Sequence, residues 1–193
     1  MVKVIQQNNK ELYQCVECGF HYGEREWVKK CEAWCREHKS CNIEITAHAE
    51  ENKQNKVLFV CAENAGRSQM AEAFFNFYTK GSNWKGESSG TIPVQEINPA
   101  VIEVMQEKGI DIRSNYPKKF NPADIGQYER VISLGCLVKE AFSQSAQSRI
   151  EDWLINDPKN KQLEEVRAIR NFIEAKIIDL LKRLKISGTK KSP

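Results

Sequence analysis

The strongest constraint on the fold is an apolar run that leads into a small-residue loop and then into a helical pattern. Val57–Val60 has the composition of a buried parallel strand. Residues 61–68 read Cys-Ala-Glu-Asn-Ala-Gly-Arg-Ser, and apolar residues then recur at helical spacing from Met70 to Tyr78, before Gly81. A strand, a tight loop and a helix in this order are typical of an α/β domain with a parallel sheet.

The rest of the chain repeats this alternation. Asn98 and Pro99 predict a helix N-cap and first turn, and Gly109 ends that helix. Residues 131–134 predict a second buried strand, and a long helix with one apolar stripe is expected over 163–184. We therefore predict a parallel sheet covered by helices on both faces. Ligands of such sheets bind at the carboxyl ends of the strands, where the loop after Val60 lies.

Composition excludes several classes of protein. The chain has 193 residues and a formal net charge of +3, without a long basic block, so we expect no nucleic-acid partner. No segment approaches the ~20 apolar residues of a membrane span, and the first ten residues lack the apolar run of a secretory signal. An odd number of cysteines, seven, argues against a paired disulfide framework. These features predict a cytoplasmic protein with no membrane partner.

The cysteines divide the chain. Five of the seven lie within the first 41 residues, and a polar stretch without periodicity follows at 49–55. We predict a Cys-rich module over residues 1–54, an α/β domain over 55–187 and a short tail over 188–193.

The loop over 61–68 is the candidate catalytic site. A helix N-terminus and successive backbone N–H groups there would bind an oxyanion, and Arg67 could grip two oxygens at once. The same positive field favours the thiolate of Cys61, which makes it a nucleophile. The plain alternative, a small buried cysteine with a surface arginine, leaves the strand–loop–helix context unexplained. The predicted binding and supporting residues are Ala62, Glu63, Asn64, Ala65, Gly66 and Ser68, the last as a hydrogen-bond donor to the thiolate.

Residues 57–184 resemble the low-molecular-weight tyrosine phosphatase superfamily, and most of all its arsenate reductase branch. The resemblance rests on residues 57–61 and 64–73, on Ser89-Gly90-Thr91, on the helix that begins at Asn98-Pro99, and on the segments 109–112 and 163–167. It implies a four-stranded parallel sheet with helices on both faces. It also implies a reaction that begins with attack of Cys61 on a bound arsenate or phosphate.

A general acid should stand over the loop, because the departing oxygen needs a proton. The acid of the resembled family sits in an Asp-Pro turn, which corresponds here to Asp157 and Pro158. Asp152 is the rival carboxylate, although its place in an expected strand over 152–155 favours a structural role. Asp before Pro can also be favoured by turn geometry alone.

A second thiol separates the two activities of the superfamily. A phosphatase hydrolyses its cysteine intermediate, whereas an arsenate reductase needs another thiol to break the bond between Cys61 and arsenic. Cys136 matches the first resolving cysteine of the reductase branch, unless it is a buried structural residue. Residues 137–143 contain no further cysteine, in contrast to many thioredoxin-coupled members. Cys61 and Cys136 could be reduced directly, a small thiol could resolve the intermediate, or an N-terminal cysteine could do so.

The expected rim of the pocket also favours the reductase. Phosphotyrosine phosphatases of this superfamily carry aromatic residues after the Asp-Pro turn, whereas this chain has Lys159-Asn160-Lys161. We therefore predict an arsenate reductase that uses thioredoxin or a small thiol and needs no cofactor for the catalytic step. The alternatives are a tyrosine phosphatase and a non-catalytic domain that binds an anion or a protein.

The N-terminal cysteines suggest a metal site. Cys15 and Cys18 form a Cys-x2-Cys-Gly turn, and Cys31 and Cys35 lie four residues apart on one face of an expected helix. Zinc held by two such pairs would explain how this short segment folds with few aliphatic residues. Alternatively, the thiols could capture arsenite, supply electrons to Cys61, or pack as small core residues. Further candidate ligands are Cys41, His21 and His38.

Overall fold

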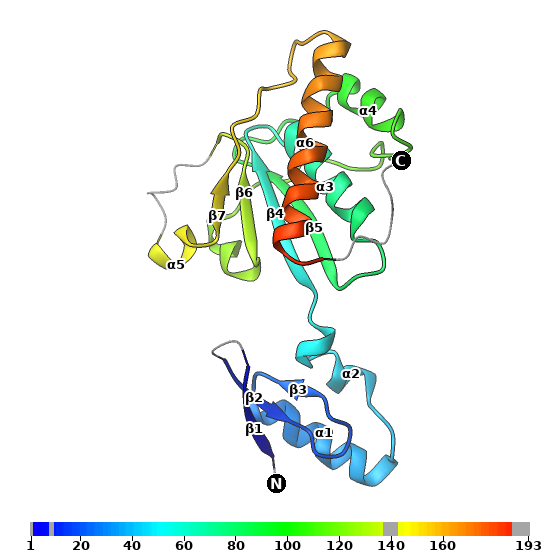
Figure 1. Ribbon diagram of the computed structural model, residues 1–193, viewed down its shortest axis with the longest axis vertical. Helices are drawn as coiled ribbons and strands as arrows, with labels where there is room; N and C mark the ends of the chain where they lie inside the picture. Colours follow the sequence, from blue (N-terminus) through cyan, green and yellow to red (C-terminus); the bar gives the residue numbers. More distant parts are fainter. Residues whose placement is uncertain (1, 8–9, 137–142, 187–193) are drawn as a thin grey trace. The chain divides into compact units, whose positions relative to one another are not determined.

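The computed structural model describes residues 2–7, 10–136 and 143–186 and divides the chain into two compact units, residues 1–54 and 55–193 (Figure 1). Each unit has its own core and is described by itself. Residues 137–142 and the expected tail over 188–193 lie outside the described residues.

The first unit is a small antiparallel sheet packed on one main helix. The strands lie in the order β1-β2-β3, and α1 follows them. The elements are β1 (Lys3–Gln7), β2 (Lys10–Gln14), β3 (His21–Tyr22), α1 (Arg25–His38), α2 (Ile43–Thr46) and the short 3-10 helix η1 (Glu50–Asn52). The sequence predicts α1 but not the hairpin, because β1 and β2 are largely polar and show no clear apolar alternation.

Cysteines form much of this unit's core. Cys15, Cys31 and Cys35 are buried together with Tyr22 and Val28. The expected shortage of aliphatic side chains is therefore real, and sulfur atoms occupy the centre where a larger domain would place Leu or Ile.

The second unit contains a four-stranded, entirely parallel sheet, as the sequence predicts. The order of the strands is β5-β4-β6-β7, so the strand that carries the loop, β4, is central (Figure 1). The strands are β4 (Asn55–Cys61), β5 (Trp84–Gly90), β6 (Arg130–Ser133) and β7 (Ile150–Asp152). The helical elements are α3 (Arg67–Tyr78), α4 (Pro99–Gln106), η2 (Pro122–Gln127), α5 (Gln144–Gln147) and α6 (Leu163–Arg183).

The two faces of β4 contact different cores. Val57, Phe59 and Cys61 pack with α3, α4 and α6, whereas Leu58 and Val60 face the smaller cluster that includes η2. This alternation is the period-2 pattern of a strand buried on both sides. The predicted apolar stripe of α6 is confirmed, since its five members are all buried: Val166, Ile169, Ile173, Ile177 and Leu181.

The expected strand over residues 152–155 is wrong in its bounds. The strand ends at Asp152, and one further ladder bond joins Trp153 N to Ser133 O at 2.7 Å. Beyond it the chain leaves the sheet, and Leu154 is 84% exposed. Within the described residues, no helix is long and apolar enough to cross a membrane.

Candidate active site

The loop over residues 61–66 connects the end of the central strand to the start of α3. Cys61 is the last residue of β4, and Gly66 is the N-cap of α3. The Cys61 sulfur is buried and has two hydrogen-bonding neighbours, Asn64 N at 3.2 Å and Ser68 Oγ at 2.9 Å. Two donors at one sulfur stabilise the negative charge of a thiolate.

The direction of the hydrogen bond from Ser68 follows from its neighbours. The backbone N–H of Lys118 can only donate, and it bonds the Asn64 Oδ1 atom at 2.7 Å. The Asn64 amide nitrogen then donates to Ser68 Oγ at 2.8 Å and to Ser88 Oγ at 2.9 Å. Because Ser68 accepts this bond, its own hydrogen is free to point at Cys61. The geometry thus supports the predicted donor role of Ser68.

A chain of buried and partly buried polar groups continues this network. Ser88 donates to Glu72, and Lys118 Nζ lies 3.4 Å from Glu72 Oε2. Asn64 itself has a φ of 52°, in the left-handed region that Asn tolerates. Sequence reasoning missed the roles of these three residues: Ser88 and Lys118 lie far from the loop in the sequence, and Glu72 on α3 shows by its own position no link to the loop.

Arg67 is held rigidly at the base of the site. Its Nη1 atom donates to Leu134 O at 3.0 Å and to Ile155 O at 3.2 Å, and Nη2 bonds Asp157 Oδ2 at 2.6 Å. These carbonyls follow β6 and β7, so the guanidinium joins the ends of two strands to the loop. The structure brings Cys61, Arg67 and Asp157 to one site, as the sequence predicts.

Asp157 sits in a turn with half of its side chain exposed, 51%. Its Oδ1 atom accepts a hydrogen bond from Lys159 N at 2.9 Å, which fixes the turn. Pro158 packs tightly against the loop, since a Cβ atom on Gly66 would lie 2.7 Å from Pro158 Cγ. The rival Asp152 does not line the pocket and instead accepts from Gly135 N at 3.2 Å. This contact favours Asp157 over Asp152 as the acid.

A pocket of about 500 Å³ opens over the loop. Cys61, Arg67 and Asp157 line it, and Lys159 on the acid-bearing turn forms an ion pair with Glu63 of the loop. The Glu63 carboxylate raises the pKa of Lys159, so the ammonium stays charged beside the pocket. The rim next to the acid is thus ionic, and it offers an aryl group no ring to stack on at Lys159, Asn160 or Lys161.

The other loop residues bind the segment that follows β5. The carbonyls of Ala62, Glu63 and Ala65 accept hydrogen bonds from the backbone N–H groups of residues 92, 94 and 98, at 2.9, 3.2 and 3.0 Å. These three bonds tie the loop to residues 92–98. The loop conformation therefore depends on a second segment of chain as well as on its own residues.

Cys136 lies close to the site but outside the pocket. Its thiol is half-buried and donates to Val60 O at 3.3 Å, and it packs against the cluster on the face of β4 opposite to Cys61. Burial, together with the negative charge of the nearby Cys61, raises the pKa of Cys136 to about 11. Gly135, in front of it, has a φ of 75°, which favours glycine. The Cys136 thiol would have to leave Val60 O before it could attack Cys61 on the other face of β4.

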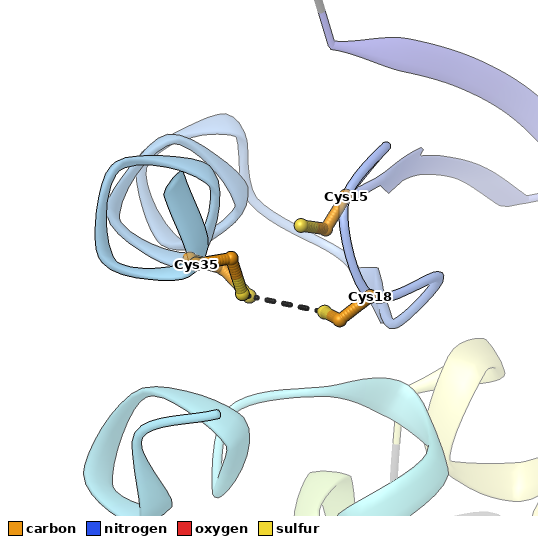
Figure 2. Close-up of side chains that lie close together, drawn as sticks. Cys15, Cys18 and Cys35 are labelled. Atoms are coloured by element: carbon orange, nitrogen blue, oxygen red, sulfur yellow. Dashed lines mark hydrogen bonds between the residues drawn. The ribbon is translucent and has the colours of Figure 1, made fainter. Parts of the chain in front are cut away.

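The first unit brings four thiols together. The sulfur atoms of Cys15, Cys18, Cys31 and Cys35 lie within 4.8 Å of one another, with Cys18–Cys31 at 3.5 Å and Cys31–Cys35 at 3.9 Å. Figure 2 shows Cys15 and Cys18 pointing from their turn toward Cys35 on α1. Zinc–sulfur bonds of about 2.3 Å in a tetrahedron place sulfurs roughly 3.8 Å apart, whereas a disulfide needs about 2.05 Å. The thiol geometry therefore suits a tetrahedral metal ion.

The remaining candidate ligands lie outside this group. Cys41 is exposed, the ring of His21 bonds Glu51, and the ring of His38 stacks on Trp34 with centroids 3.8 Å apart. The sulfurs of the two cysteine pairs thus suffice for four coordination positions.

Fold and site together define a class of enzymes in which a cysteine at the end of a parallel strand attacks a tetrahedral oxyanion. The family model for low molecular weight phosphotyrosine protein phosphatase matches residues 56–190, and the chain belongs to this family. The resemblance found in the sequence is thereby confirmed.

The similar proteins include both arsenate reductases and a tyrosine phosphatase. A glutaredoxin arsenate reductase of Synechocystis sp. is 33% identical over 130 residues, which are 67% of this chain and 98% of the relative. A solved arsenate reductase in the phosphate binding state is 36% identical, with a TM-score of 0.59, over 69% of this chain and 99% of that one. A low molecular weight protein tyrosine phosphatase from T. tengcongensis is 25% identical, with a TM-score of 0.61, over 67% and 99%.

Proposed function

We propose that this protein is an arsenate reductase that attacks arsenate with Cys61 and releases arsenite through a second thiol. The observation that carries the proposal is Cys136, a free thiol beside the catalytic loop that a phosphatase does not need. The similarity to two arsenate reductases and the ionic rim formed by Glu63 and Lys159 support it.

The first step uses the loop and the acid. Arsenate enters the pocket, and Arg67 exchanges its bond to Asp157 for oxygens of the bound anion. The Cys61 thiolate attacks arsenic in line with the As–O bond that breaks, while Ser68 and Asn64 N stabilise the thiolate beforehand. Asp157, in its protonated form, gives its proton to the departing oxygen, which leaves as water. The product is a bond between Cys61 and arsenic(V).

The second step reduces arsenic. The thiolate of Cys136 attacks the Cys61 sulfur, and the electron pair of the sulfur–arsenic bond goes to arsenic. Arsenic(V) becomes arsenic(III), and the two thiols become one disulfide, so two electrons balance. Thioredoxin, a glutaredoxin-coupled thiol or another small thiol then restores both cysteines. The high pKa of Cys136 implies that it becomes reactive once its sulfur leaves the half-buried position beside Val60 O.

A phosphatase is the second candidate, since the same loop and acid would hydrolyse a phosphate monoester. The similarity to a tyrosine phosphatase structure favours it. A non-catalytic role is the weakest candidate, because Cys61, Arg67 and Asp157 form a complete catalytic set.

Arsenite release from arsenate tests the proposal, with thioredoxin, glutaredoxin plus glutathione, and small thiols as separate reductants. Hydrolysis of p-nitrophenyl phosphate is measured in parallel. Arsenate turnover should be lost in Cys61→Ser and in Cys136→Ser, and kept in Cys41→Ser, which removes an exposed cysteine outside both sites. Phosphate ester hydrolysis that survives Cys136→Ser, without formation of arsenite, would show a phosphatase instead.

We also propose that Cys15, Cys18, Cys31 and Cys35 hold a structural zinc ion in the first unit. The distances between their sulfurs fit, and four thiolates are a donor set that zinc prefers. Zinc would supply folding energy to a unit whose core is largely made of thiols. Reduced thiols at both sites are consistent with a cytoplasmic location.

A further inference from the structure

Tyr22 occupies a central place in the first unit. It ends β3, where it pairs with Tyr13 of β2 on one side and forms an isolated bridge with Ala49 on the other. Its side chain is 0% exposed and packs in the same cluster as Cys15 and Cys31. Two backbone partners thus fix this ring among the four thiols.

The hydroxyl group of Tyr22 has an unusual environment. The ring packs in the same buried cluster as Cys31, and burial together with the neighbouring Cys31 thiol raises the pKa of Tyr22. Within the part of the chain that the structure describes, no atom is placed to form a regular hydrogen bond with the hydroxyl. Buried hydroxyls nearly always have a partner, and an exception calls for an explanation. A phenylalanine would fill the same space without this cost, so packing alone does not account for the oxygen atom.

We propose that Tyr22 is a positioning residue of the metal site, whose hydroxyl donates a hydrogen bond to the thiolate of Cys31. The inference rests on the proposed occupation of the four thiols by a metal ion. A thiol is a weak acceptor, whereas a thiolate that binds a metal carries negative charge and accepts strongly. Four thiolates around a divalent ion have a net charge of −2, and a neutral donor at one of them offsets part of that charge.

The position of Cys31 explains why this thiolate needs a donor. Cys31 is buried on α1, and its sulfur lies 3.5 Å from that of Cys18 and 3.9 Å from that of Cys35. It therefore experiences two close like charges once the thiols ionise. Cys18 is half-buried and can be solvated in part, an option that the fully enclosed Cys31 lacks.

The test compares Tyr22→Phe with Tyr13→Phe in the full-length protein. Tyr13 is a matched control because it pairs with Tyr22 in the sheet, while its own hydroxyl bonds the exposed Glu11. Loss of an outer hydrogen bond to a ligand typically weakens metal binding by about 10–100-fold. Competition with a chromophoric chelator should show this loss for zinc in Tyr22→Phe and wild-type affinity in Tyr13→Phe.

Cobalt(II) substitution gives a readout that a packing role would not change. Loss of a hydrogen bond raises the energy of the thiolate electrons, so the sulfur-to-cobalt charge-transfer band of Tyr22→Phe should move to longer wavelength. If Tyr22→Phe fails to fold, NMR of wild-type protein loaded with an NMR-active cadmium isotope replaces it. A slowly exchanging tyrosine hydroxyl proton coupled to cadmium is then expected.

The outcomes separate the two proposals. Unchanged affinity and an unchanged band in Tyr22→Phe, or a cadmium-loaded wild type without the protected hydroxyl, would overturn the role of Tyr22 and leave the zinc site standing. A wild-type protein that takes up neither zinc nor cobalt at its four thiols would overturn both. Arsenate turnover is not needed for either conclusion.

Discussion

Asn64 should be the residue on which the conformation of the catalytic loop depends most. Its side chain donates to Ser68 and Ser88 and accepts from Lys118 N, and its backbone has a φ of 52°. Substitution by alanine removes these three bonds and a longer one from Gln69 Nε2 at 3.3 Å, and it places a residue with a Cβ atom but no polar side chain in the left-handed region. Substitution by glycine removes the same bonds but not the freedom to adopt this backbone conformation.

The two substitutions separate these effects. Loss of the three shorter hydrogen bonds, at about 1 kcal/mol each, should lower the free energy of unfolding of either variant by roughly 3 kcal/mol. Asn64→Ala carries an additional cost of about 1–2 kcal/mol for left-handed backbone. In Asn64→Gly the additional loss of unfolding free energy is about 0.4–1 kcal/mol, because glycine gives the unfolded chain more conformational freedom. We therefore expect Asn64→Ala to be the less stable of the two by roughly 0.5–1 kcal/mol.

Urea denaturation of both variants and wild type measures these differences, with the zinc content matched so that the first unit contributes equally. Ser88→Ala serves as a control that leaves the backbone of residue 64 unchanged; it removes the bonds of Ser88 to Asn64 and to Glu72 and should cost about 2 kcal/mol. Equal stability of the alanine and glycine variants would refute the reasoning about backbone strain. A total loss of unfolding free energy below about 1 kcal/mol would show that the hydrogen bonds of Asn64 contribute little to stability, contrary to our expectation.

Two further changes test the surroundings of the site. Gly66→Ala should push Pro158 and the turn that carries Asp157 outward, because the new Cβ would lie 2.7 Å from Pro158 Cγ. Arsenate turnover should then fall by about 10²-fold and the free energy of unfolding by about 1–3 kcal/mol. Unchanged turnover would contradict this view. The carboxylate of Glu107 is bonded by Arg167 and Arg170, which lower its pKa from 4.5 to about 2. Its stabilising effect is therefore complete above pH 4.5 and is lost as the pH falls toward 2, so the stability gap between wild type and Glu107→Gln in denaturant titrations should close over this range.

The amino-acid sequence by itself determined the features that depend on local pattern. The apolar run at 57–60, the small-residue loop and the helical spacing after it predict the strand, loop and helix in order, and the structure has all three. The stripe of α6 and the start of α4 at Pro99 follow from the same kind of pattern. Hydrophobic period and capping residues act over a few neighbouring positions, so they can be read without knowing the fold.

Other features came from contacts between distant segments. The strand β5 carries Ser88 but reads as polar, so its place beside β4 and its bond to Asn64 were not predictable from its own residues. The direction of the Ser68 hydrogen bond depends on the backbone N–H of Lys118, 54 residues from Asn64. Likewise, a Cys-x2-Cys turn indicates a metal site, but only the packing of β3 against α1 brings the ring of Tyr22 into one cluster with Cys15, Cys31 and Cys35. The reason is physical: hydrogen bonds between distant segments depend on three-dimensional proximity, which local pattern does not encode.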